Sequence, residues 1–64
     1  MTTLITEPPR CVSVGDAARL LNVGRSTAYD LIRSGRLRSF KIGRRRLVPR
    51  DAVEDLIADL AGED

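Results

Sequence analysis

The residues of this sequence best suited to chemistry are arginines, and most of them lie in its middle. Residues 25–50 contain nine of the eleven basic residues and a single acidic one, Asp30. The net charge of +8 over this segment predicts a polyanionic partner. Ten of the eleven basic residues are arginine, whose planar guanidinium suits bidentate contacts to phosphate or guanine. GC-rich codon usage explains the preference for arginine over lysine equally well.

The ends of the chain differ from this basic centre. The charges of residues 1–24 cancel, whereas residues 51–64 contain six acidic residues and no basic one. Because an acidic segment cannot lie on a polyanion, we expect the C-terminal part to provide either solubility or a surface for another protein.

Other kinds of chemistry lack their usual residues. Histidine, the commonest general base and metal ligand, is absent. Cys11 is the only cysteine, which excludes an internal disulfide and multi-cysteine zinc sites, so we expect a small buried or edge residue there. A chain of 64 residues also leaves little room for a catalytic pocket. We therefore expect a protein that is not an enzyme and that holds no metal or cofactor.

Targeting signals are not visible in the sequence. The first ten residues have no useful apolar run, and no stretch approaches the roughly 20 apolar residues of a membrane-spanning helix. These features predict a soluble cytoplasmic protein without a membrane partner.

Two short amphipathic helices are expected to precede most of the arginines. Ser13 followed by Asp16 is typical of a helix N-terminus, and Asn22 suits the left-handed residue after a helix end. The inward face of this first helix is predicted to comprise Val14, Ala17, Ala18, Leu20 and Leu21.

The second helix is expected over residues 27–34. Ser26 is the predicted N-cap, and Gly35 is the predicted stop. Its inward residues would be Ala28, Leu31 and Ile32, and its outward residues would be Thr27, Tyr29, Asp30 and Arg33. Two such helices joined by a short turn predict a helix-turn-helix.

From Leu37 the apolar period changes to two, which predicts a β-hairpin. Phe40 and Ile42 would face inward and Lys41 outward, with glycine at the first turn position in Gly43–Arg44. The tip would then carry Arg44, Arg45 and Arg46, and Pro49 would end the second strand.

A third helix is expected from about Asp51 to Leu60 or Ala61. Asp51 followed by Glu54 resembles a capping pattern, and the predicted core stripe comprises Val53, Leu56, Ile57 and Leu60. The predicted fold is mainly α with a small β-hairpin, a winged helix-turn-helix in the order helix, helix, strand, strand, helix. This domain would span residues 12–61, between a flexible N-terminal segment over 1–11 and a tail over 62–64.

The sequence resembles the excisionase family, small phage and plasmid DNA-binding proteins with a MerR-like winged helix-turn-helix. SVGDAARLLNV is similar to the first helix and turn of the family. GRSTAYDLIRSGRL is similar to its recognition helix, and FKIGRRRLVPRDAVEDLI to its wing and closing helix. The resemblance covers roughly residues 12–60 and extends over five features in order.

The resemblance implies a protein that binds and bends attachment-site DNA in a bacterial host and directs a phage integrase toward excision, without chemistry of its own. The small size and the uneven charge also favour several copies side by side on the DNA. Two alternatives remain open at this point. One is a phage or plasmid transcriptional regulator with the same domain, and the other is a protein-interaction module that acts through the acidic third helix.

Eleven residues are candidates for contact with double-stranded DNA. The second helix of a helix-turn-helix enters the major groove, and arginines of a wing read the width of the minor groove. The candidates are Arg25, Ser26, Thr27, Tyr29, Asp30, Arg33, Arg38, Lys41, Arg44, Arg45 and Arg46.

Several of these candidates also have a structural explanation. Ser26 would cap its helix, the ring of Tyr29 would pack against the wing, and the arginine run would be a solvated surface. Asp30 departs from the family pattern, since some family members carry a basic residue at this position. An acidic side chain there repels phosphate. It would accept a hydrogen bond from a cytosine amino group or pair with Arg33 or Arg25.

Overall fold

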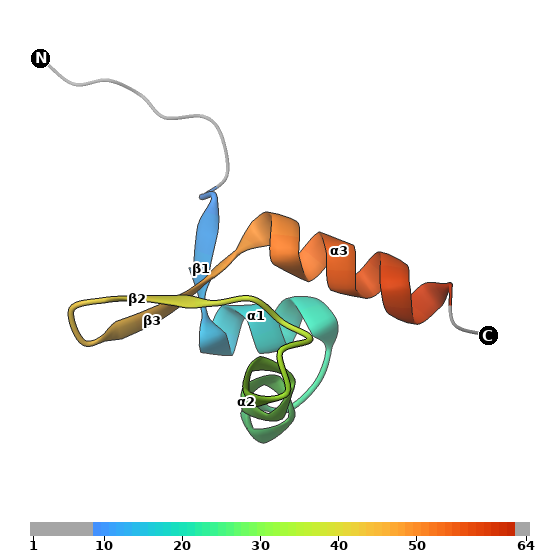
Figure 1. Cartoon of the computed structure of the whole chain (residues 1–64), viewed down its shortest axis with the longest axis horizontal. Helices are drawn as coiled ribbons and strands as arrows, with labels where there is room; N and C mark the ends of the chain where they lie inside the picture. The colour runs from blue at the N-terminus through green and yellow to red at the C-terminus, as the bar shows by residue number, and fades with distance from the viewer. Residues whose placement is uncertain (1–8, 63–64) are drawn as a thin grey trace, which may run out of the picture.

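Three helices and a three-stranded sheet make up the computed structural model, which describes residues 9–62 (Figure 1). The elements are β1 (Cys11–Ser13), α1 (Val14–Leu21), α2 (Arg25–Arg33), β2 (Phe40–Ile42), β3 (Arg45–Pro49) and α3 (Arg50–Ala61). This order confirms the predicted helix-turn-helix with a hairpin before the last helix, and adds the short strand β1. Most of the predicted flexible segment, residues 1–8, and most of the predicted tail, residues 63–64, lie outside the described residues.

Helix α1 begins and ends where its sequence predicts. The Ser13 side chain accepts a hydrogen bond of 3.1 Å from the backbone N–H of Asp16, as an N-cap does. At the other end Asn22 adopts the left-handed conformation with φ 59°. The N–H of Val23 then donates to the carbonyl of Ala18 at 2.9 Å. This bond gives a carbonyl of the last helical turn a partner and turns the chain toward α2.

The predicted N-cap of the second helix is wrong. Helix α2 starts at Arg25 with Gly24 as the N-cap residue and no side-chain capping bond, and Ser26 lies in the first turn. The C-terminal end is as predicted, because Gly35 takes a positive φ of 84° that glycine adopts without strain. The N–H of Arg36 then donates to the carbonyl of Leu31 at 3.0 Å, which closes the helix.

These two serines provide a test of the capping assignment. We expect Ser13→Ala to lower the free energy of unfolding by about 1 kcal/mol, because the Asp16 N–H loses its partner. The matched change Ser26→Ala should alter it by only a few tenths of a kcal/mol, since α2 has no side-chain cap to lose. Urea denaturation followed by circular dichroism measures both, and equal effects would contradict the assignment.

The sheet has the strand order β1-β3-β2, with both pairs antiparallel. Val12 pairs with Val48 between β1 and β3, and Lys41 pairs with Arg46 between β2 and β3. Strand β1 was not predicted, because three residues are too few to show an alternating pattern. It joins the start of the domain to the hairpin and holds Cys11, paired with Pro49, at an edge of the sheet.

The hairpin turns at Gly43 and Arg44, since Ile42 pairs directly with Arg45. Gly43 has φ 60° at the first turn position, which is the conformation predicted for a two-residue hairpin loop. The prediction that Phe40 and Ile42 face inward is wrong: their exposed fractions are 37% and 61%. The hairpin projects beyond the helices, so its far end has no core to face (Figure 1).

The core forms one cluster at the junction of all three helices and β3. Its buried residues are Val14, Ala17, Ala18, Ala28, Leu37, Val48, Ala52, Val53 and Leu56. Leu37 and Val48 are its largest fully buried side chains. Leu37 was not predicted as a core residue. It lies between a helix and a strand, where neither the helical nor the strand spacing of apolar residues applies.

Three other predicted core positions are wrong. Ile57 and Leu60 of α3 are each 42% exposed, and Leu20 of α1 is 46% exposed. Helix α3 instead buries Ala52 beside Val53 and Leu56. The N-cap of α3 is Pro49 without a side-chain bond, so the capping role expected of Asp51 is also wrong, although Asp51 lies in the first turn.

Helix α3 extends away from the body on the side opposite the hairpin tip (Figure 1). Its exposed acidic residues Asp51, Glu54, Asp55 and Asp59 are therefore kept apart from Arg44 in the turn. Within residues 9–62, none of the helices is long and apolar enough to cross a membrane.

Candidate nucleic-acid interface

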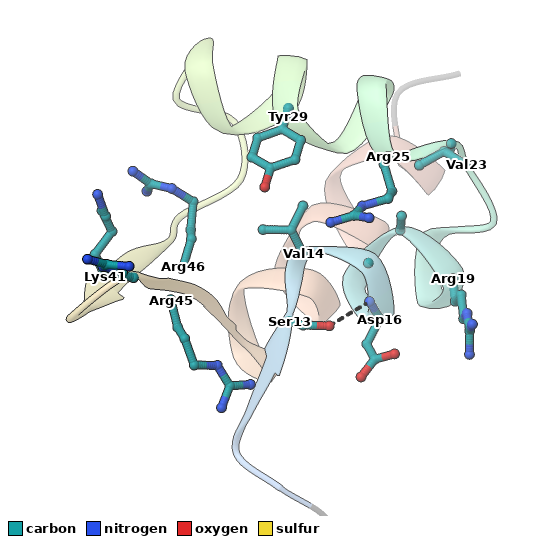
Figure 2. Close-up of a pocket in the computed structure, with 14 residues that line it drawn as sticks. Ser13, Val14, Asp16, Arg19, Val23, Arg25, Tyr29, Lys41, Arg45 and Arg46 are labelled. Atoms are coloured by element: carbon teal, nitrogen blue, oxygen red, sulfur yellow. Dashed lines mark hydrogen bonds between the residues drawn. The ribbon is translucent and has the colours of Figure 1, made fainter.

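A groove of about 830 Å³ lies between the helix-turn-helix and the hairpin (Figure 2). One wall is formed by the start of α1 and the start of α2, and the other by β2, the turn and β3. Its lining residues are Ser13, Val14, Gly15, Asp16, Ala18, Arg19, Val23, Gly24, Arg25, Tyr29, Lys41, Arg44, Arg45 and Arg46.

The charge of this groove is strongly positive. Six of its lining residues are arginine or lysine, and Asp16 is the one carboxylate among them. Such a concave basic surface concentrates anions, and phosphate suits the guanidinium groups. Among residues 9–62, no cluster of three or more histidine, cysteine or acidic side chains is placed to hold a metal ion.

Helix α2 contributes Arg25 and Tyr29 to the groove. These residues are one helical turn apart and therefore share a face of α2. The Arg25 side chain lies over the first turn of α1, close to Gly15, where an added Cβ would be 3.9 Å from its Nε. Tyr29 was predicted to face outward, but it is half-buried, packs against the core cluster and points into the groove (Figure 2).

The three consecutive arginines of the hairpin take three different positions. Of the three arginines predicted at the tip, Arg44 lies in the turn itself, and Arg45 and Arg46 are the first two residues of β3 after it. Arg46 is half-buried, and its Nη1 donates to the Ser39 hydroxyl at 2.7 Å. It extends toward the Tyr29 side of the groove, whereas Arg45 extends the other way (Figure 2). Ser39 thus positions one arginine while the other two stay exposed.

The solvent-facing side of α2 carries four of the other candidates. Ser26 and Thr27 are exposed on the first turn, where the N-terminal part of a recognition helix meets base edges. Asp30 and Arg33 form an ion pair one turn further along. Pairing with Arg33 was one of the alternatives expected for Asp30. Both side chains of this pair are about two-thirds exposed, so it contributes little to stability.

The Asp30–Arg33 pair predicts a gain of affinity on removal of the carboxylate. We expect Asp30→Asn to bind random-sequence duplex about fivefold more tightly, because repulsion of phosphate disappears and Arg33 is released. The melting temperature should stay nearly the same. Fluorescence anisotropy with labelled duplex measures the affinity, and an unchanged or lower affinity would contradict the prediction.

Arg38 is the one candidate that lies neither in the groove nor on α2. Its Nη2 lies 3.2 Å from Oδ2 of Asp55, so the side chain joins the segment before β2 to helix α3 rather than the groove. Sequence reasoning also missed Arg19, which lines the groove, and Ser39, which accepts a hydrogen bond from Arg46. Arg19 has no signal beyond its outward position on α1, and Ser39 has none.

Comparison with known proteins defines the class first. Residues 11–61 match the helix-turn-helix domain family, and the chain belongs to this family of helix-turn-helix proteins. Within this class it is 48% identical over 60 residues to an excisionase from Streptomyces ambofaciens, covering 94% of this chain and 97% of the relative. The chain is therefore a helix-turn-helix protein of the excisionase family.

A second relative supports the same assignment. The chain is 40% identical over 52 residues to a probable excisionase from Saccharopolyspora erythraea, covering 81% of this chain. The matched region is 53% of that relative, which is about half its length. No solved structure showed a significant match to the chain.

Proposed function

We propose that this protein is a DNA-binding excisionase that acts on attachment-site DNA and does no chemistry itself. The observation that carries the proposal is the basic groove between the two parts of the fold that bind DNA in winged helix-turn-helix proteins. The two excisionase relatives support the direction of the reaction, from integrated to excised DNA. The site of action would be the bacterial cytoplasm, where this DNA is found.

The shape of the groove suggests how the duplex is held. A single sugar–phosphate strand separates the major groove of DNA from the neighbouring minor groove. This strand would lie in the basic groove, with Arg25 on one side and Lys41 and Arg46 on the other. Helix α2 would then enter the major groove with Ser26 and Thr27 toward the bases, and the hairpin would enter the minor groove.

Binding by one copy of so small a domain would be weak. A single DNA-binding module buries little surface, so selectivity would come from several copies on adjacent sites. Neighbouring copies would bend the DNA and present it to an integrase. Helix α3 extends away from the hairpin tip (Figure 1), and its acidic residues Glu54, Asp55 and Asp59 are exposed, so they would be accessible to such protein partners.

An excision assay tests the proposal. A plasmid carrying the two attachment sites of the integrated element is incubated with the cognate integrase, with and without this protein. We expect the excised circle to form only when the protein is present, and to be lost with Arg25→Ala, which removes a groove arginine from an exposed position. Specific DNA binding without any effect on excision would instead support the transcriptional regulator.

A further inference from the structure

Ile42 is an apolar side chain in an unusual place. It is 61% exposed, the highest value among the exposed large hydrophobic residues of the described chain. It is the last residue of β2 and comes directly before the turn at Gly43 and Arg44. Its cross-strand partner is Arg45. Neither the core nor the groove includes Ile42.

The pleat of the hairpin places Ile42 and Lys41 on opposite faces. Lys41 and Arg46 form one cross-strand pair, and Ile42 and Arg45 form the next, so the two pairs lie on opposite faces. Ile42 and Phe40 therefore share the face that turns away from Lys41. The far end of the hairpin thus combines one prominent apolar side chain with the exposed cations Arg44 and Arg45.

We propose that Ile42 is a wedge that enters the minor groove and packs between base steps, which kinks the duplex at the hairpin. This inference rests on the proposed function, because it needs the hairpin to reach the minor groove. The flanking arginines would be attracted to the phosphates on either side and would bring the isoleucine to the floor of the groove. Apolar side chains placed in this way partly unstack a base step and bend DNA toward the major groove.

A DNA occupant fits this surface better than a second protein does. A stable protein interface buries about 600 Å² or more on each partner. On this face of the described hairpin, Ile42 and Phe40 are the only exposed large hydrophobic side chains. A base-step wedge needs only one side chain. The position at the tip also matters, since α2 and the body lie behind the hairpin and leave its end free to enter a narrow groove (Figure 1).

If Ile42 is a wedge, its loss should reduce DNA bending and affinity without changing the salt dependence of binding. We expect Ile42→Ala to bind duplex DNA about tenfold more weakly, through loss of buried apolar surface, and to bend it much less than the wild type does. The slope of affinity against salt should stay unchanged, because no phosphate contact is lost. Ile57→Ala, the same change at a 42% exposed position on α3, is the matched control and should behave as wild type.

The experiment uses short attachment-site duplexes that carry a fluorophore pair at their ends. Energy transfer reports the bend, and 2-aminopurine placed at flexible pyrimidine–purine steps reports unstacking. Loss of both signals in Ile42→Ala, with wild-type behaviour of Ile57→Ala, is the expected result. Equal bending and affinity in wild type and Ile42→Ala would overturn the wedge and leave the proposed function intact.

Two other results would also overturn it. Failure of the wild type to bind any attachment-site duplex would refute the proposed function and the wedge together. Normal binding and bending by a single copy of Ile42→Ala, with loss of only the later complexes in a titration, would show that this face meets another copy instead.

Discussion

Replacing Arg44, Arg45 and Arg46 together by alanine is expected to lower the affinity for attachment-site DNA by about two orders of magnitude. All three side chains line the basic groove, and within residues 9–62 none of them forms an ion pair with an acidic side chain. A loss of about 1 kcal/mol for each phosphate contact, a typical value for one hydrogen bond, gives this total. Mobility-shift titration measures it.

The salt dependence of this variant provides a second and more specific readout. Each phosphate contact steepens the logarithmic dependence of affinity on salt by about 0.9, so the slope of the triple variant should be shallower by about 2.7. Between about 50 and 200 mM salt, the wild type should therefore lose about 40-fold more affinity than the variant does. A variant with the wild-type slope would show that the three arginines do not contact phosphate.

The matched control is the triple change Arg44→Lys/Arg45→Lys/Arg46→Lys. It keeps the three charges and removes the planar guanidinium groups. We expect this variant to keep the wild-type salt slope. It should lose affinity only to the extent that the arginines make bidentate contacts, which lysine cannot make. Full wild-type affinity would favour codon usage as the reason for the arginine-rich composition.

The second large effect concerns stability and falls on Leu37. This side chain is 1% exposed and lies between helix α2 and the hairpin, in contact with the single core of the domain. We expect Leu37→Ala to lower the free energy of unfolding by about 2–5 kcal/mol. A core of this size supplies only about 3–5 kcal/mol, so much of the variant should be unfolded at room temperature.

Far-ultraviolet circular dichroism during urea denaturation measures this loss. Leu20→Ala is the matched control, because Leu20 is 46% exposed on α1 and its truncation should change stability by about 0.5 kcal/mol or less. Similar losses in the two variants would contradict the assignment of Leu37 to the core and of Leu20 to the surface.

Local rules predict the parts of this fold that depend on near neighbours. The cap at Ser13, the left-handed Asn22 and the turn at Gly43 each follow from one residue and its immediate sequence. The family resemblance adds the order of the elements. These signals are sufficient for the helix-turn-helix and for the position of the hairpin.

The failed predictions depend on contacts distant in sequence. Ile42 follows an alternating pattern that would face a core, but the hairpin extends past the body and no core reaches its tip. Strand β1 exists because β3 pairs with it. The hydrogen bond between Ser39 and Arg46 joins residues seven apart through the fold of the hairpin, and no local pattern indicates it. The groove likewise depends on contacts distant in sequence, because its two walls come from separate segments of the chain.

The most direct test of the central claim is a titration of ¹⁵N-labelled protein with attachment-site duplex, followed by amide chemical shifts. The claim is that DNA lies in the groove between α2 and the hairpin. The account predicts that the largest shifts occur at Arg25, Ser26 and Thr27 of α2 and at residues 41–46 of the hairpin, with little change in the C-terminal half of α3. Shifts concentrated on α3, with the groove unchanged, would contradict the account and identify the acidic helix as the binding surface.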